Sequence, residues 1–119
     1  MVVKAEYDSI IMSTKIIFFI LIIAGTVLEV FGDVLFKKWV VDHRNLFFWT
    51  GFTIYAIDTL FWAYSLKYET LSKAIAVFTI LNLIIIVLVG VIFFKENLTL
   101  ANKIGIVLGV LSILLMEIG

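Results

Sequence analysis

The sequence predicts an all-α integral membrane protein with four transmembrane helices, folded as one domain over residues 1–119. Hydrophobic residues make up 64% of the chain, which is too high for a soluble domain of this length. They gather in four runs near residues 16–36, 46–66, 71–94 and 98–118, each close to the roughly 20 residues that a membrane-spanning helix needs. Because lipid offers the backbone no hydrogen-bond partners, these runs are expected to be helices rather than open strands.

The first run, residues 16–36, carries an acid, Glu29, near its middle. Placing a charged carboxylate at that depth costs about 3 kcal/mol, so the residue is interpreted as a proton or cation site. Loss of water favours its protonated form, and a second copy of the acid nearby would titrate together with the first. Competition between a proton and a cation for one carboxylate would give exchange. The alternative is a neutral carboxyl that only fastens two helices.

A second acid of this run, Asp33, lies four residues after Glu29 and four before Lys37. The spacing and the acid-first order favour a structural ion pair with Lys37, while direct participation in the site is the alternative. Gly25 and Gly32 lie beside the acids, where small residues leave room for another helix or for a solute.

The second run, residues 46–66, places Tyr55, Asp58, Trp62 and Ser65 three or four residues apart, on one polar and aromatic stripe. Asp58 is an acid at membrane depth and therefore a second site candidate. A hydrogen bond to a tyrosine or to a neighbouring helix is its structural alternative. The aromatic faces of this stripe suit organic cations, although aromatic residues more often serve in packing.

The last two runs carry fewer polar residues. In residues 71–94, Phe78 could form an aromatic wall of the site, and Asn82 is expected to bond across helices. In residues 98–118, Gly105 and Gly109 form a GxxxG pattern, which is typical of close contact between helices. That contact could join two subunits or pack the helix within one bundle.

The sequence lacks the motifs of several function classes. The chain has no cysteine and one histidine, His43, so neither a disulfide nor a metal site is expected. It also lacks a nucleotide-binding loop, a catalytic triad and a basic nucleic-acid patch. We therefore expect no enzyme, no nucleic-acid partner and no cofactor, with H⁺ as the coupling ion.

Residues 1–11 are mixed in polarity and expected at the surface, and Met12 could itself be a start.

The positive charges are nearly balanced across the membrane. If both termini share one side, that side holds four lysines and the other holds five basic residues: Lys4, Lys15, Lys67 and Lys73 against Lys37, Lys38, Arg44, Lys95 and Lys103. The positive-inside rule then gives weak orientation. Either one orientation prevails through smaller effects, or the chain inserts both ways and pairs antiparallel.

Two motifs resemble those of the small multidrug resistance family, within the drug/metabolite transporter superfamily. The first is the segment 24–32, AGTVLEVFG, followed by Leu35 and Lys37, and the second is the segment 93–100, FFKENLTL, leading into residues 103–105. The resemblance covers about residues 16–115. It implies that Glu29 binds both protons and substrate in an antiparallel homodimer, and that Tyr55 lies near the pocket. It places Asp58 where guanidinium exporters have a serine.

The chain departs from the family pattern at several positions. Phe78 stands where exporters carry a tryptophan, Ile75 where they carry a tyrosine, and residues 79–82 lack the usual glycine. Asp33 and Asp58 are additional acids.

The expected function is proton-coupled antiport of a small organic cation by alternating access in the inner cell membrane. A lipid-linked sugar flippase subunit and a non-transporting membrane assembly or regulatory subunit are the alternatives.

Overall fold

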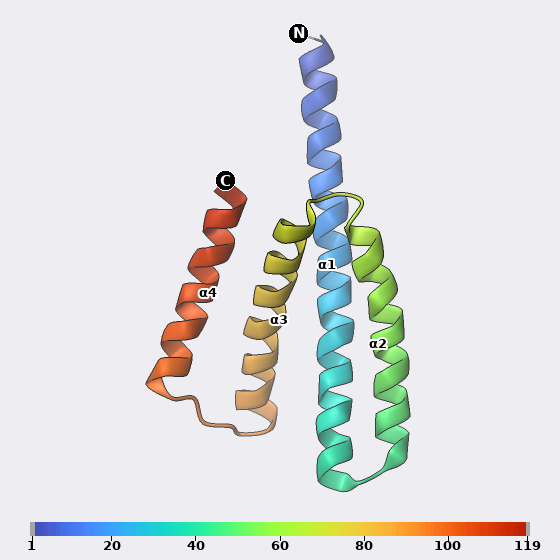
Figure 1. Cartoon of the computed structure of the whole chain (residues 1–119), viewed down its shortest axis with the longest axis vertical. Coiled ribbons are helices and arrows are strands. Elements are labelled where there is room, and N and C mark those ends of the chain that lie inside the picture. Colours follow the sequence, from blue (N-terminus) through green and yellow to red (C-terminus); the bar gives the residue numbers. More distant parts are fainter. Residues whose placement is uncertain (1, 119) are drawn as a thin grey trace. The chain divides into compact units, whose positions relative to one another are not determined.

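The computed structural model describes residues 2–118 and the side chains of residues 3–118. This part of the chain contains four α-helices and no strand (Figure 1): α1 (Val2–Asp42), α2 (Asn45–Ser65), α3 (Leu71–Phe93) and α4 (Leu100–Ile118). All four are long and apolar enough to cross a membrane, which confirms the predicted fold class. The contacts between residues divide the chain into two units, Met1–Ala74 and Ile75–Gly119, which are described in turn.

Helix α1 is longer than predicted. Within the described residues it begins at Val2 and runs on to Asp42, so the expected surface segment and most of the expected loop 37–45 are helical. At 1.5 Å per residue its 41 residues measure about 60 Å, about twice the hydrocarbon thickness of a bilayer. No glycine or proline interrupts residues 2–24, and nothing else in the sequence there stops a helix. The first apolar run of the sequence lies between Lys15 and Lys37 of this helix.

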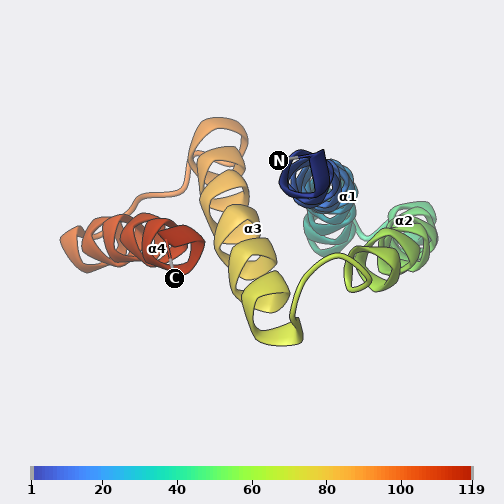
Figure 2. The same cartoon turned by 90° about the horizontal axis from the view of Figure 1, so that it is seen from above.

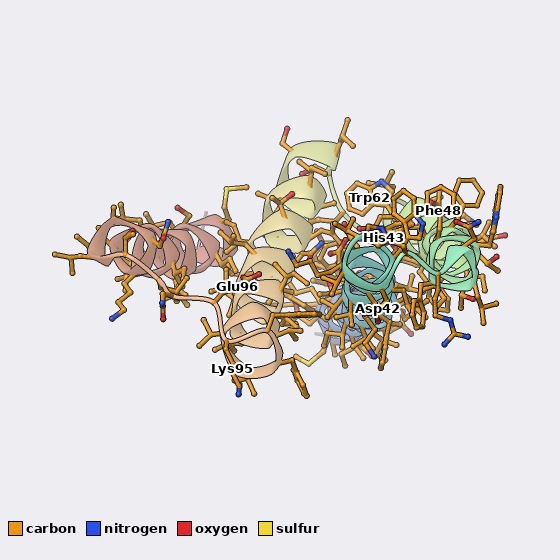
Figure 3. All side chains as sticks on the ribbon, turned by 90° about the horizontal axis from the view of Figure 1, so that it is seen from below. Asp42, His43, Phe48, Trp62, Lys95 and Glu96 are labelled. Carbon is orange, nitrogen blue, oxygen red and sulfur yellow. The ribbon has the colours of Figure 1, made fainter. Side chains whose placement is uncertain are left out.

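A tight turn at residues 43–44 joins α1 to α2. His43 adopts a left-handed conformation with φ 58°, and its N–H donates to the carbonyl of Trp39 at 2.8 Å, which closes the helix. The rings of Phe36 and Trp39 pack against Phe48 of α2, with centroids 5.7 and 4.9 Å apart. Figure 3 shows Asp42, His43 and Phe48 at this end of the unit. The aromatic contacts fix where the two helices begin to pair.

Helices α1 and α2 run antiparallel, side by side along the whole of α2 (Figures 1 and 2). They approach closely at two glycines: a Cβ on Gly51 would lie 3.3 Å from the Gly32 carbonyl oxygen, and a Cβ on Gly32 would overlap the Tyr55 ring. The N-terminal part of α1 extends past the end of α2 (Figure 1), and residues 3–17 include no buried side chain.

In the second unit, α3 ends in a turn that folds back on Gly90. Lys95 is left-handed, with φ 53°, and the N–H of Glu96 donates to the Gly90 carbonyl at 3.1 Å. The Glu96 carboxylate lies against Gly90, in the space that a Cβ would take. Figure 3 labels Lys95 and Glu96 in this turn.

Helix α4 starts with a side-chain cap. The Thr99 Oγ1 accepts from the Asn102 N–H at 3.1 Å, and the Asn102 Oδ1 accepts from the Thr99 N–H at 3.1 Å, a reciprocal pair that begins the helix. No residue of α4 is buried. A Cβ on Gly109 would make ordinary contact with Ile80 of α3 at 3.5 Å, whereas one on Gly105 would meet no described atom within 4 Å.

Candidate functional site

The candidate site lies where α1 and α2 pair in the first unit. Thr26, Glu29 and Asp33 follow one another on one stripe of α1, at intervals of three and four residues. Glu29 and Asp33 are half-buried, and the Oε2 atom of Glu29 is fully buried. The stripe is continuous because the helix has no break in this part.

The facing side of α2 is the stripe that the sequence predicts. Asp58 and Ser65 are buried, with exposed fractions of 6% and 0%, and Tyr55 and Trp62 are half-buried. Together with Gly51 they form the side of α2 that packs on α1. The predicted periodicity of this helix is thus confirmed.

A hydrogen bond across the two helices joins the stripes. The Tyr55 hydroxyl donates to the Oδ1 atom of Asp33. The predicted ion pair between Asp33 and Lys37 is wrong: no such pair is present in the described part of the chain, and Lys37 is exposed. Asp33 lies on the side of α1 that faces α2, so the tyrosine hydroxyl is within its reach. The structural alternative for Asp58 is a hydrogen bond to a tyrosine or to a neighbouring helix. Among the described residues the Tyr55 hydroxyl donates to Asp33 instead, and the Oδ1 atom of Asp58 has no partner.

Three carboxyls interact with the same tyrosine. The Tyr55 hydroxyl interacts electrostatically with Asp33, Glu29 and Asp58, and Asp58 interacts with the like charge of Asp33. The sequence has no Lys, Arg or His between residues 15 and 37, nor between residues 44 and 67. These two stretches therefore supply no basic side chain of their own to the acids.

The antiparallel pairing also sets which residues lie at the same depth. Tyr55 lies opposite Gly32 and Asp33. Moving one turn forward along α2 corresponds to moving one turn back along α1, which places Asp58 at about the depth of Glu29. Thr26 lies three residues further along α1, about 4.5 Å along the helix axis.

Two buried polar atoms of the paired helices lack hydrogen bonds. Thr26 is 1% exposed and Asp58 is 6% exposed. Neither Thr26 Oγ1 nor Asp58 Oδ1 has a hydrogen-bond partner among the described residues. Most buried polar atoms in proteins are paired, so each of these two atoms is a candidate contact for a ligand or water. Thr26 was not among the predicted site residues; its position three residues before Glu29 was the available signal.

The remaining predicted site residues lie in the second unit. Phe78 is a half-buried residue of α3, and so is Asn82, whose Oδ1 atom is buried without a hydrogen-bond partner in the described chain. The expected helix-to-helix bond of Asn82 is therefore not found there. Of the GxxxG glycines, Gly109 lies against α3 and Gly105 is exposed.

A sequence model of the family described as Small Multidrug Resistance protein matches residues 16–109, which is most of the chain. The chain belongs to the small multidrug resistance family. Comparison with curated proteins and with solved structures finds no match. Members of this family are small-molecule transporters rather than enzymes, and the four apolar helices make this one a multi-pass membrane protein.

The match to the small multidrug resistance family bears on the geometry in one further way. It begins at residue 16, so it includes Glu29, Asp33 and Asp58 and excludes residues 2–15 of α1. All residues of the candidate site lie within the part of the chain that defines the family.

Proposed function

We propose that this protein exports small organic cations in exchange for protons, by alternating access, in the inner cell membrane. The observation that carries the proposal is the grouping of Glu29, Asp33 and Asp58 around Tyr55 within two membrane spans that hold no basic residue. Carboxylates at that depth need a positive partner, and a proton and an organic cation are both suitable.

In this proposal Glu29 is the shared binding group. Its buried carboxyl holds a proton or a cationic substrate, and binding of one displaces the other. This competition couples the two movements. If the site changes the side of the membrane that it faces only when it is occupied, a proton and a substrate molecule cross in opposite directions. Tyr55 and Asp58 line the site, the hydroxyl of Tyr55 holds Asp33 in place, and Phe78 supplies an aromatic surface.

The working unit is proposed to be an antiparallel homodimer that places two copies of Glu29 in one shared site. Among the described residues, α1 and α2 pair along the whole of α2, and no residue of α4 is buried. A second copy would cover the apolar surface of α4 and add walls to a path across the membrane.

The proposal is tested with purified protein in liposomes that contain a pH indicator. Addition of a cationic substrate should release protons through the wild-type protein. Glu29→Gln removes the ionisable group at nearly constant volume and should reduce proton release to that of empty liposomes, while Glu29→Asp should retain part of it. The matched control is Glu6→Gln, the same change at an exposed position of α1 outside the matched region.

Circular dichroism and size exclusion in detergent establish that each variant is folded. Proton release by folded Glu29→Gln at the wild-type rate would contradict the mechanism. A loss of release in Glu6→Gln as well would show that the assay reports insertion rather than the site.

A further inference from the structure

We infer that the turn between α1 and α2 binds the phosphate of an anionic lipid between the side chains of Lys38 and Arg44. The inference does not depend on the proposed function, because it concerns the end of the helix pair and not the acids.

The first step concerns two like charges at one aromatic ring. The Nζ atom of Lys38 lies 5.9 Å from the centroid of the Phe47 ring, and the guanidinium carbon of Arg44 lies 5.3 Å from it. Lys38 belongs to α1 and Arg44 to the turn, so the fold brings the two cations together. A ring face attracts a cation weakly at an exposed site and leaves its charge in place. The two side chains therefore form a small positive site.

The second step concerns the missing counter-ion. Asp42 is the only acid between residues 34 and 57. It lies four residues after Lys38, but this basic-first order is the less favourable one for an ion pair on a helix. Neither Lys38 nor Arg44 pairs with a carboxylate among the described residues. With Lys37, the turn holds three basic residues and one acid, so it attracts an anion from outside the chain.

The third step concerns the depth of this site. The first apolar run ends before Lys37 and the second begins at Leu46, so the turn lies where the chain leaves the hydrocarbon. Trp39 and Trp49 both pack on Phe48 here, with ring centroids 4.9 and 5.2 Å apart. Tryptophan is enriched at the membrane–water interface, at the level of the lipid headgroups. The positive site is therefore at the depth of lipid phosphates.

The fourth step distinguishes a lipid from a free anion. Leu46 and Trp49 follow Arg44 on α2 and are 63% and 62% exposed, which offers an apolar surface that an acyl chain can cover. A free phosphate would use the charges alone, whereas a lipid uses the charges and this surface. Arginine binds phosphate through two parallel N–H donors and lysine binds it as a point charge. A headgroup without a positive charge, such as phosphatidylglycerol, suits two cations better than phosphatidylcholine does.

The test measures how strongly brominated lipids quench the tryptophan fluorescence of the full chain in vesicles. The chain has three tryptophans, and Trp62→Phe leaves the two at this turn, Trp39 and Trp49. Phosphatidylcholine vesicles receive increasing amounts of brominated phosphatidylglycerol or, in parallel, brominated phosphatidylcholine. Because both leaflets have the same composition, the result does not depend on how the chain is inserted. We expect a preference for phosphatidylglycerol of about tenfold.

Three variants and a control locate that preference. Lys38→Gln and Arg44→Gln should each reduce it about threefold, whereas Arg44→Lys keeps the charge and should retain most of it. Lys67→Gln is the matched control. Lys67 is exposed and lies 5.1 Å from the centroid of the Tyr64 ring, but no second cation of the described chain shares that ring. Its loss should leave the preference unchanged.

Equal quenching by the two lipids, with Lys38 and Arg44 intact, would overturn the inference, and so would a preference that neither variant changes. An equal reduction in Lys67→Gln would also overturn it, because the effect would then follow net charge. Inorganic phosphate, compared with chloride at equal ionic strength, should not displace the lipid. Displacement by phosphate would identify a free-anion site and overturn the assignment to a lipid. Circular dichroism establishes that each variant is folded, as expected for changes at exposed side chains.

Discussion

At the scale of single residues, the bond from Tyr55 to Asp33 is the contact that organises the acids. It ties α1 to α2 beside Glu29 and keeps the tyrosine ring over Gly32. A carboxyl at this depth without its donor would be poorly solvated, so the bond stabilises one arrangement of the site.

Tyr55→Phe removes only the hydroxyl and keeps the ring packing. We expect proton-coupled transport in liposomes to fall about fivefold to tenfold, the equivalent of one hydrogen bond of about 1 kcal/mol or slightly more. Tyr64→Phe is the matched control, because Tyr64 is 56% exposed on the same helix. Wild-type rates in Tyr55→Phe would show that the bond is incidental to transport.

The sequence predicts part of this site and misses part, for identifiable reasons. Helical spacing alone places Tyr55 and Asp58 on one stripe, and the depth of Glu29 in an apolar run singles it out. The partner of Asp33 is not predictable in this way, because the choice between Lys37 and a tyrosine on another helix depends on the register of α1 against α2. Thr26 is missed because a single hydroxyl in an apolar helix normally satisfies itself.

At the scale of helices, the close pairing of α1 and α2 depends on the glycine at position 32. Gly32→Ala places a methyl group into the Tyr55 ring, with the Gly51 carbonyl oxygen at 3.4 Å, so ring or helix must move. We expect a loss of about 1–3 kcal/mol in stability, the usual effect of overpacking. Thermal unfolding in detergent should show a lower Tm.

Gly105→Ala is the control for that change. Its methyl group would meet no described atom within 4 Å, and alanine favours a helix over glycine by about 1 kcal/mol. Its Tm should therefore equal or exceed that of the wild type. If Gly32→Ala were as stable as Gly105→Ala, the result would contradict the close approach of α1 and α2 at Gly32.

Helix α1 also shows where apolar runs are a poor guide to helix ends. The four apolar runs predict all four helices, because a helix that lies in lipid must be apolar along most of its length. They do not predict that α1 continues through residues 2–15 and 38–42, where the composition is mixed but no glycine or proline occurs. Hydropathy marks the part of a helix that lies in lipid, whereas the helix itself stops only where the backbone is interrupted.

At the scale of the whole molecule, the chain exposes far more apolar surface than its own packing covers. Large side chains such as Leu111, Leu114 and Leu115 of α4 are at least 50% exposed, and no residue of this helix is buried. Lipid can cover such a surface, and so can a second copy. A second copy packed against α4 is the cover that the proposed dimer would provide.

The last prediction concerns how two such chains are oriented. The near balance of basic residues between the two sides should let the chain insert both ways, and an antiparallel dimer requires both forms. Lys4→Gln with Lys67→Gln leaves two basic residues against five and should bias insertion one way. Arg44→Gln, Lys95→Gln and Lys103→Gln together leave two against four and should bias it the other way. Reporters at the C-terminus should then show a single orientation for each of the two variants, whereas the wild type shows both.

Each variant alone should transport poorly because it lacks an oppositely inserted partner, and co-expression of the two should restore transport. All five changed residues are exposed, and none of them is Glu29, Asp33, Tyr55 or Asp58, so the loss cannot be attributed to the site itself. Full transport by one variant, in cells where its reporter shows a single orientation, would mean that parallel chains suffice. The acids of α1 and α2 would then work within a subunit or in a parallel pair, and the charge balance would have no role in assembly.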